Sequence, residues 1–119
     1  MIDLNRPIYL LLNGIAAVEL EFPDTKASFP VITITEVSNV NSLTVGEKEA
    51  VSDITYQIDV WDNEQTRQRC ERIAAKVNEE MTKNHFTRTM GRGFRDPGSG
   101  LHRKTMYFNG KFINLYEER

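Results

Sequence analysis

"ITYQIDVWDNEQTRQRCERIAAKVNEEMTKN" (Ile54–Asn84) changes its hydrophobic period after its first eight residues. Over Ile54–Trp61 apolar and polar residues alternate, which is typical of a β-strand with one face in a core. One face carries Ile54, Tyr56, Ile58 and Val60, and the other carries Thr55, Gln57, Asp59 and Trp61. This segment is therefore predicted to be a central strand.

The second part of the same stretch has the spacing of an amphipathic helix. Its apolar stripe consists of Cys70, Ile73, Ala74, Val77 and Met81. Asp62 is the predicted N-cap, since Gln65 follows at the spacing of a capping box. Asn84 is the predicted end of the helix.

Working outward toward the N-terminus, "VITITEV" (Val31–Val37) is rich in β-branched residues and alternates as a strand does. It is predicted to pair antiparallel with Ile54–Trp61. Residues 39–53 between them lack a strong period and are predicted to form a long flexible loop, with Gly46 at its tip.

The N-terminal residues predict a short helix that Asn5 caps and that ends at Asn13-Gly14. Residues 15–30 are predicted to be a loop between helix and strand, with a short extended piece at Val18–Phe22.

On the C-terminal side, residues 85–94 predict a third strand, and "RDPGSG" (residues 95–100) predicts a tight turn. A fourth strand follows from Leu101, and Asn109-Gly110 is expected to interrupt it as a turn or bulge. Phe112, Ile113 and Leu115 are candidates for a further edge segment.

The expected order is helix, strand, strand, helix, strand, strand over a single domain of residues 1–119. This order predicts an α+β fold, with a mostly antiparallel four-stranded sheet and two helices packed on one face. The predicted core contains Ile32, Ile34, Tyr56, Ile58, Val60, Ile73, Val77 and Met81.

Charge is distributed unevenly along the chain. From Thr82 to Lys111 there are seven basic residues and one acid, a local net charge of about +6 in a chain whose net charge is −2. Such asymmetry fits either a basic surface for nucleic acid or copies that contact one another through acidic and basic sides. A nucleic-acid binder is more often basic overall, which favours the second interpretation.

The sequence predicts no enzyme, no cofactor and no metal site. The spacing of Gly93 and Gly98 resembles a phosphate loop, but the required lysine and the following helix are absent. His85 and His102 have no ligand at a metal spacing, and Cys70 lies on the apolar stripe of the helix. With one cysteine no internal disulfide can form, and no apolar run is long enough to cross a bilayer.

Basic and aromatic residues alternate around the predicted C-terminal hairpin. Arg88, Arg92, Arg95, Arg103 and Lys104 lie among Phe94, Tyr107 and Phe108. This pattern is compatible with binding single-stranded nucleic acid, but the acidic overall charge favours a sheet edge protected by charge.

Several short motifs together resemble the tail completion, tail terminator or head–tail joining proteins of long-tailed bacteriophages. The resemblance covers about residues 31–110: a Tyr-Gln-x-Asp-x-Trp strand before the long helix, then a Gly-Phe strand, an acidic turn and a Gly-Leu-x-x-Lys-x-x-x-Phe strand. The matching positions are Tyr56, Gln57, Asp59, Trp61, Gly93, Phe94, Asp96, Gly100, Leu101, Lys104 and Phe108.

The resemblance implies structural work in a virion. Such proteins form rings, commonly of six subunits, at the head-proximal end of the tail tube, where they stop tube growth and dock onto the head connector. Expected partners are other copies of the chain, the tail tube protein, head connector or stopper proteins and DNA passing through the lumen. No membrane partner is expected, and the protein would be in the host cytoplasm before assembly.

Two groups of residues are the predicted contacts. Docking to tube or connector is expected at Val45, Gly46, Glu47, Lys48 and Glu49, and subunit or DNA contact at Arg92, Arg95, Arg103 and Lys104. The alternative function is a small nucleic-acid-binding module that uses the basic hairpin of residues 88–104.

Overall fold

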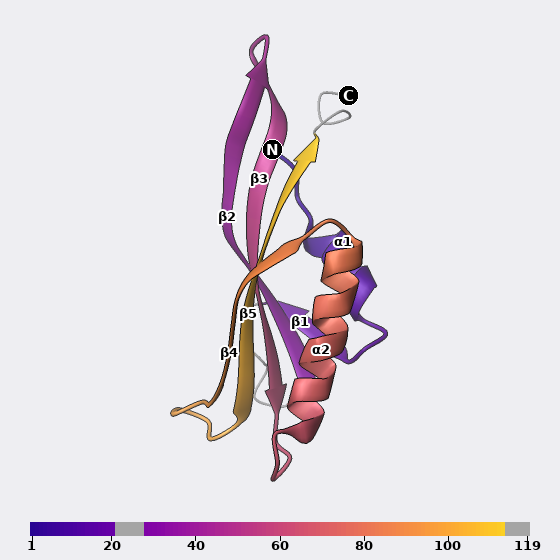
Figure 1. Cartoon of the computed structure of the whole chain (residues 1–119), viewed down its shortest axis with the longest axis vertical. Helices are drawn as coiled ribbons and strands as arrows, with labels where there is room; N and C mark the ends of the chain where they lie inside the picture. The colour runs from indigo at the N-terminus through magenta and orange to yellow at the C-terminus, as the bar shows by residue number, and fades with distance from the viewer. Residues whose placement is uncertain (21–27, 114–119) are drawn as a thin grey trace.

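A five-stranded sheet with two helices on one face forms the molecule in the computed structural model, which describes residues 1–20 and 28–113 (Figure 1). The elements are α1 (Asn5–Leu12), β1 (Ala17–Leu20), β2 (Val31–Val45), β3 (Lys48–Asp62), α2 (Gln68–Lys83), β4 (Thr87–Arg95) and β5 (His102–Ile113). The strand order is β1-β2-β3-β5-β4. All neighbouring strands are antiparallel except β1 and β2, which run parallel.

The predicted α+β class is confirmed, but the prediction of four mostly antiparallel strands was wrong in one respect. Ala17–Leu20 adds a fifth strand, in register with Val31–Ile34, and makes the sheet mixed. A strand of four residues carries little periodic signal, and its parallel pairing depends on a partner that follows later in the chain. Two parts of the predictions lie outside the described residues. They are residues 21 and 22 of the extended piece predicted at Val18–Phe22, and Leu115 of the predicted edge segment.

The loop predicted at residues 39–53 is a pair of strands. β2 and β3 remain paired as far as Val45 and Lys48, and the turn between them consists of Gly46 and Glu47. Gly46 has a φ of +65°, which favours glycine. We call residues 37–53 the hairpin arm; it projects along the long axis of a molecule that measures 54 × 25 × 25 Å (Figure 1).

β-bulges explain why the arm did not look like strands in the sequence. The pairing of β2 with β3 shifts register between Glu36 and Ser38, between Asn41 and Leu43, and again at Leu43 and Thr44. Each extra residue reverses which side chains point to which face, so the two-residue alternation is lost while backbone pairing continues.

The core lies between the sheet and the helices. All eight predicted core residues are buried there, and the core also includes Ile8, Leu12, Ile54, Cys70, Ala74, Phe86, Met106 and Phe108. Alternate residues of β3 and β5 face α2, as the period of Ile54–Trp61 predicts. Both helices therefore cover one face of the sheet (Figure 1).

The two predicted helix caps were wrong. Asp62 is the last residue of β3, and α2 begins six residues later at Gln68 without a side-chain cap. Asn5 lies inside α1, where its side-chain oxygen accepts a hydrogen bond of 2.8 Å from the Tyr56 hydroxyl. Each side chain that local spacing assigned to a cap instead accepts hydrogen bonds from another side chain, Asp62 from Arg69 and Asn5 from Tyr56.

The predicted ends of the helices are confirmed, but the interruption predicted at Asn109-Gly110 is not present. α1 ends at Leu12 and α2 at Lys83. β5 continues through Asn109 and Gly110, which pair with Thr55 and Ile54 of β3. Gly110 lies where a Cβ would come within 2.6 Å of the Phe112 ring, so a close approach explains the glycine.

Candidate interaction surfaces

A ladder of arginine and aromatic side chains crosses the face of the sheet that points away from the helices. The guanidinium of Arg103 on β5 lies 4.3 Å from the centre of the Trp61 ring on β3 and 5.5 Å from that of Phe94 on β4. Arg92, on the same strand as Phe94, lies 5.2 Å from the centre of the Phe94 ring. Trp61 in turn donates a hydrogen bond of 2.8 Å to Thr33 of β2. Cation–π stacking thus joins β3, β5 and β4, and the Trp61 hydrogen bond extends the connection to β2.

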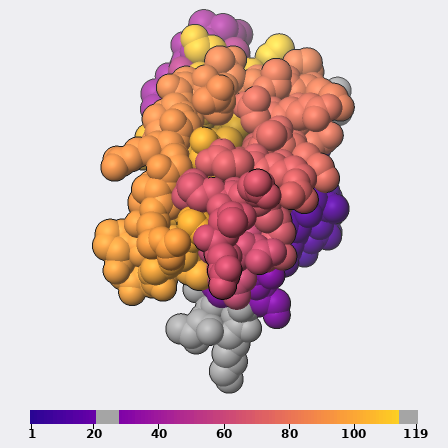
Figure 2. Space-filling model, turned by 60° about the horizontal axis from the view of Figure 1, so that its bottom comes forward, coloured from indigo at the N-terminus to yellow at the C-terminus, as the bar shows by residue number. Residues whose placement is uncertain are grey.

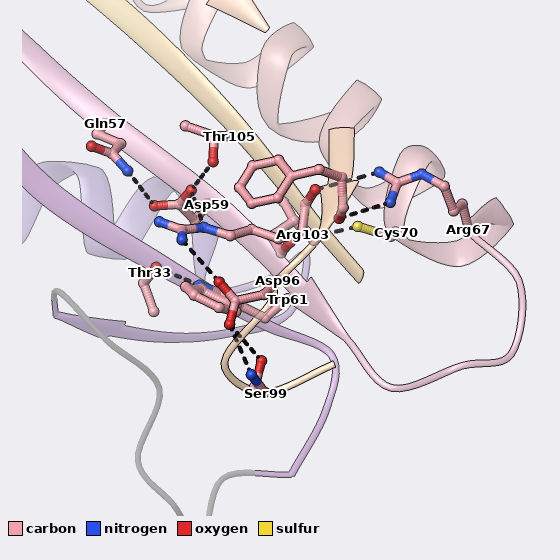
Figure 3. A network of polar contacts seen from close by, with 12 residues as sticks. Thr33, Gln57, Asp59, Trp61, Arg67, Cys70, Asp96, Ser99, Arg103 and Thr105 are labelled. Carbon is pink, nitrogen blue, oxygen red and sulfur yellow. Dashed lines mark hydrogen bonds and ion pairs between the residues drawn. The ribbon is translucent and has the colours of Figure 1, made fainter. Parts of the chain in front are cut away.

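The carboxylate of Asp59 anchors this ladder from a buried position (Figure 3). It accepts hydrogen bonds from Arg103 Nε at 3.0 Å, from the Thr105 hydroxyl and from the Gln57 amide at 2.9 Å. Arg103 also donates to Asp96 in the turn between β4 and β5, at 3.3 Å. A buried charge needs such a set of partners, so this network fixes the position of Arg103.

The turn at Arg95–Gly100 is built as the sequence predicts, as a strand connection. Asp96 Oδ2 accepts hydrogen bonds from the amide and the hydroxyl of Ser99, and Gly100 has a φ of +73°. The Ser99 hydrogen bonds, with the nearby charge of Arg103, hold the pKa of Asp96 below its ordinary value, although burial opposes this. The turn is therefore a fixed end to the hairpin.

Arg67 ties the opposite face of this hairpin to the start of α2. Its guanidinium donates to the carbonyl oxygens of Phe94 and Arg103, at 3.1 and 3.4 Å (Figure 3). It also donates to the Glu71 carboxylate at 3.1 Å. Lys104 reaches the other oxygen of Glu71 at 3.1 Å. These two partners outweigh the effect of burial and lower the pKa of Glu71.

The predicted basic contacts therefore divide into two pairs. Arg103 and Lys104 lie on opposite faces of β5, and each is used in an ion pair within the chain. Arg92 and Arg95 are exposed on β4, although Arg95 donates a hydrogen bond to the Gly100 carbonyl at 2.8 Å. The hairpin thus presents less uncompensated charge than the sequence suggests.

A hollow of about 180 Å³ separates β4 from α2, with β5 at its floor (Figure 2). It is lined by Glu71, Ala74, Ala75, Asn78, Arg88, Lys104 and Met106. Gly91 and Gly93 face this side of β4, where Arg67 and Arg88 occupy the space that larger side chains would need. Between β4 and α2, guanidinium groups therefore fill space that apolar side chains occupy in most helix–sheet contacts.

The predicted docking residues, Val45 to Glu49, lie together at the far end of the hairpin arm. Glu47 and Val45 are exposed, whereas Glu49 is partly covered and its carboxylate lies 3.2 Å from the amino group of Met1. The N-terminal segment follows the arm further, since Asn39 donates to the Ile2 carbonyl at 2.7 Å. One side of the arm is thus supported by the N-terminus.

The other side of the arm is apolar and exposed. Leu43 of β2, Val51 of β3 and Ile113 of β5 form one row across the three strands, and Val40 lies on the same face. Leu43, Val40 and Ile113 expose 52%, 55% and 62% of their surface. Sequence reasoning missed this patch, because the bulges hide which residues share a face.

Groups that could support catalysis do not come together in the residues that the structure describes. No cluster of three or more histidine, cysteine or acidic side chains is placed to hold a metal ion in these residues. Burial raises the pKa of the Cys70 thiol to about 11. His102 is also buried, with its ring against Arg67, Arg95 and the Gln65 carbonyl. In the same part of the chain, neither helix is long and apolar enough to span a membrane.

Comparison with known proteins identifies a family and solved structures of the same fold. The family model described as "Tail completion protein gp17" matches residues 8–109. The solved structure of the bacteriophage SPP1 gp17 protein matches with a TM-score of 0.55 and 16% sequence identity, over 93% of this chain and 89% of that chain. A search of curated protein sequences finds no match.

The family match begins at Ile8 within α1 and ends at Asn109 within β5, so it includes β1 to β4, α2 and the hairpin arm in full. The SPP1 protein shares the fold. The motifs that resemble phage tail completion proteins all lie within the matched residues. The chain therefore belongs to the tail completion protein gp17 family, a family of structural phage tail proteins and virion components.

Proposed function

We propose that this protein forms a ring, of six subunits, at the head-proximal end of the phage tail tube. There it ends the growth of the tube and joins the tail to the head connector. The family membership carries the proposal, because a role in phage tail assembly follows from it. The expected partners are other copies of the chain, the tail tube protein and connector or stopper proteins.

The hairpin arm is the proposed docking element for tube or connector. Its tip, Val45 to Glu49, is held away from the core by paired strands. A partner can reach it without disturbing the packing of α2 on the sheet. A paired arm also loses less conformational entropy on docking than the flexible loop that the sequence suggested.

The exposed arginines of β4 are the proposed site of subunit or DNA contact. Arg92 and Arg95 are exposed and can reach a neighbouring subunit or a phosphate group, although Arg95 would have to release the Gly100 carbonyl. Arg103 and Lys104 would have to break ion pairs within the chain. DNA that passes through the lumen needs only weak attraction. This arrangement supports a virion role better than the alternative of a nucleic-acid-binding module at residues 88–104.

Electron microscopy of particles made without this gene tests the proposal. Over-long tails are expected if the protein ends tube growth, and normal tails lying apart from filled heads are expected if its main task is joining. Supplying the protein in trans should restore joined particles. Intact, infectious particles in the absence of the gene would refute the virion role.

Salt dependence tests the alternative separately. If the protein is a nucleic-acid-binding module that uses the basic hairpin of residues 88–104, it should bind a labelled single-stranded oligonucleotide at low salt, and binding should weaken steeply as salt rises. A steep decrease of affinity with salt concentration that disappears in the combined variant Arg92→Glu and Arg95→Glu would favour the nucleic-acid-binding module. We expect no specific binding at physiological salt.

A further inference from the structure

Exposed large hydrophobic side chains gather at two separate places among the described residues. Met1, Val37, Val40, Leu43, Val45 and Ile113 lie on or against the hairpin arm, and Tyr9, Leu10 and Leu20 lie on α1 and β1. Contiguous exposed apolar surface on a small protein often marks a binding site.

The second place is a groove. It encloses about 400 Å³ between α1 and β1, and its lining residues are Asn5, Arg6, Tyr9, Val18, Glu19 and Leu20. β1 forms one edge of the sheet, with β2 as its strand neighbour. The groove thus combines an apolar floor with a short sheet edge that accepts a further extended segment.

Charge complements shape at these two places. Glu47 is exposed in the turn at the tip of the arm, and Arg6 is exposed on the rim of the groove. Within the described chain, neither side chain has a hydrogen bond or an ion pair. Two unpaired, opposite charges beside two apolar patches are the pattern expected of complementary surfaces.

The two places cannot meet within one molecule as it is folded. The tip of the arm points away from α1 and β1 along the long axis (Figure 1). We propose that the apolar arm of one copy, with Glu47 at its tip, docks in the α1–β1 groove of a second copy beside Arg6. Such a contact joins two different surfaces and repeats head to tail, so it closes a ring or extends a filament. The inference rests on the proposed ring and names its subunit contact. For the tip of the arm it puts a second copy of the chain in the place that the proposed function gives to the tube or connector.

Disulfide trapping on the full-length protein tests this contact. One chain carries Val45→Cys in the arm, and a tagged second chain carries Leu20→Cys at the groove. After oxidation of an equimolar mixture, the mixed disulfide should exceed the Val45→Cys homodimer about tenfold, because docking raises the effective concentration of the two thiols. The native Cys70 is buried in both chains and should therefore take no part in the disulfide.

Charge reversal makes the test specific. Glu47→Arg in the arm chain should lower the yield of mixed disulfide, as should Arg6→Glu in the groove chain. Combining the two reversals should restore the yield. A lasting loss in the combined mixture would mean that the two charges do not face each other, and it would overturn the proposal.

A matched partner chain with Thr89→Cys on β4 shows whether the arm prefers the basic hairpin. A larger yield of mixed disulfide with Thr89→Cys than with Leu20→Cys would mean that the arm docks on β4. Equal yields at the level of random collision would mean that the arm binds a different protein. Either result would overturn the proposal. Because the measurement uses purified protein, these outcomes are independent of the particle morphology that tests the proposed function.

Discussion

At the scale of single residues, the buried carboxylate of Asp59 governs what Arg103 can do. Asp59 is 1% exposed and depends on Arg103 for its opposite charge, while the Arg103 side chain is itself 17% exposed. A residue of this kind is a structural support for the β4–β5 hairpin. Its conspicuous position in a basic motif does not make it available to a partner.

The stability of Arg103 variants checks this assignment. Arg103→Ala should lower the free energy of unfolding by about 3 kcal/mol, because it leaves a buried carboxylate without its counter-charge. Arg92→Ala should change the same quantity by less than about 0.5 kcal/mol, since Arg92 is exposed and stacks on the ring of Phe94. Urea unfolding measures both, and equal effects would contradict the network.

Asp62 is a second buried carboxylate that depends on an arginine, in this case Arg69. Burial disfavours its charge, but the hydrogen bonds and charge of Arg69 prevail and lower its pKa. Below the unfolded value of 3.8 the unfolded chain takes up the proton first. The stabilisation is therefore complete above that pH and is lost as the pH falls through the folded pKa.

Acid unfolding shows this contribution. Between about pH 4 and pH 3 the free energy of unfolding should fall more steeply for the natural protein than for Asp62→Asn, which has no carboxylate to protonate. Urea titrations at several pH values give the comparison. Parallel pH profiles would mean that the Asp62–Arg69 pair adds nothing to stability.

At the scale of the elements, β4 is attached to α2 by arginines where most sheets use apolar side chains. Arg67 donates to two carbonyl oxygens of the hairpin and to Glu71. The glycines of β4 make this possible, because a Cβ at Gly93 would lie 2.3 Å from the Arg67 guanidinium. A Cβ at Gly91 would lie 2.8 Å from the guanidinium of Arg88, which is exposed.

These two glycines make a matched pair of variants. Gly93→Ala should displace the Arg67 head from its hydrogen bonds and destabilise the fold by about 1–2 kcal/mol. Gly91→Ala should shift only an exposed arginine, with a change below about 0.5 kcal/mol. Thermal or urea unfolding distinguishes the two, and a neutral Gly93→Ala would show that Arg67 repositions at no cost.

At the scale of the whole molecule, an elongated shape separates stability from assembly. The core lies where the helices cover the sheet, and the arm extends beyond it (Figure 1). Exposed arm residues contribute little burial to folding, and their apolar character supports the contact with other chains that we propose.

Polar substitutions on the arm should therefore affect particles and leave folding intact. The combined change of Val40→Ser and Leu43→Ser should alter the free energy of unfolding by less than about 1 kcal/mol, because both side chains are more than half exposed. Infectious titre in a complementation assay should fall at least about tenfold, while Lys76→Ala on the outer surface of α2 should have no effect. Full complementation by the arm variant would contradict an assembly role for this surface.

The sequence by itself determined the centre of this protein. The period of Ile54–Trp61, followed by that of α2, identifies which side chains face each other, because burial on one face of an element is written in local spacing. The predicted core residues and the antiparallel pairing of β2 with β3 followed from it and are confirmed. The family resemblance rested on motifs in the same region and is confirmed.

Only the tertiary structure decided the arm, the parallel strand β1 and the partners of Arg103 and Lys104. Each depends on register between strands or on contact between residues distant in sequence, such as Asp59 with Arg103 and Glu71 with Lys104. Local periodicity carries no information about register once bulges shift it, and a charge pattern does not reveal which charges are already paired. The physical reason is that local spacing within one element shows which of its side chains are buried. Strand register and ion pairing depend on a second element, whose position local spacing does not give.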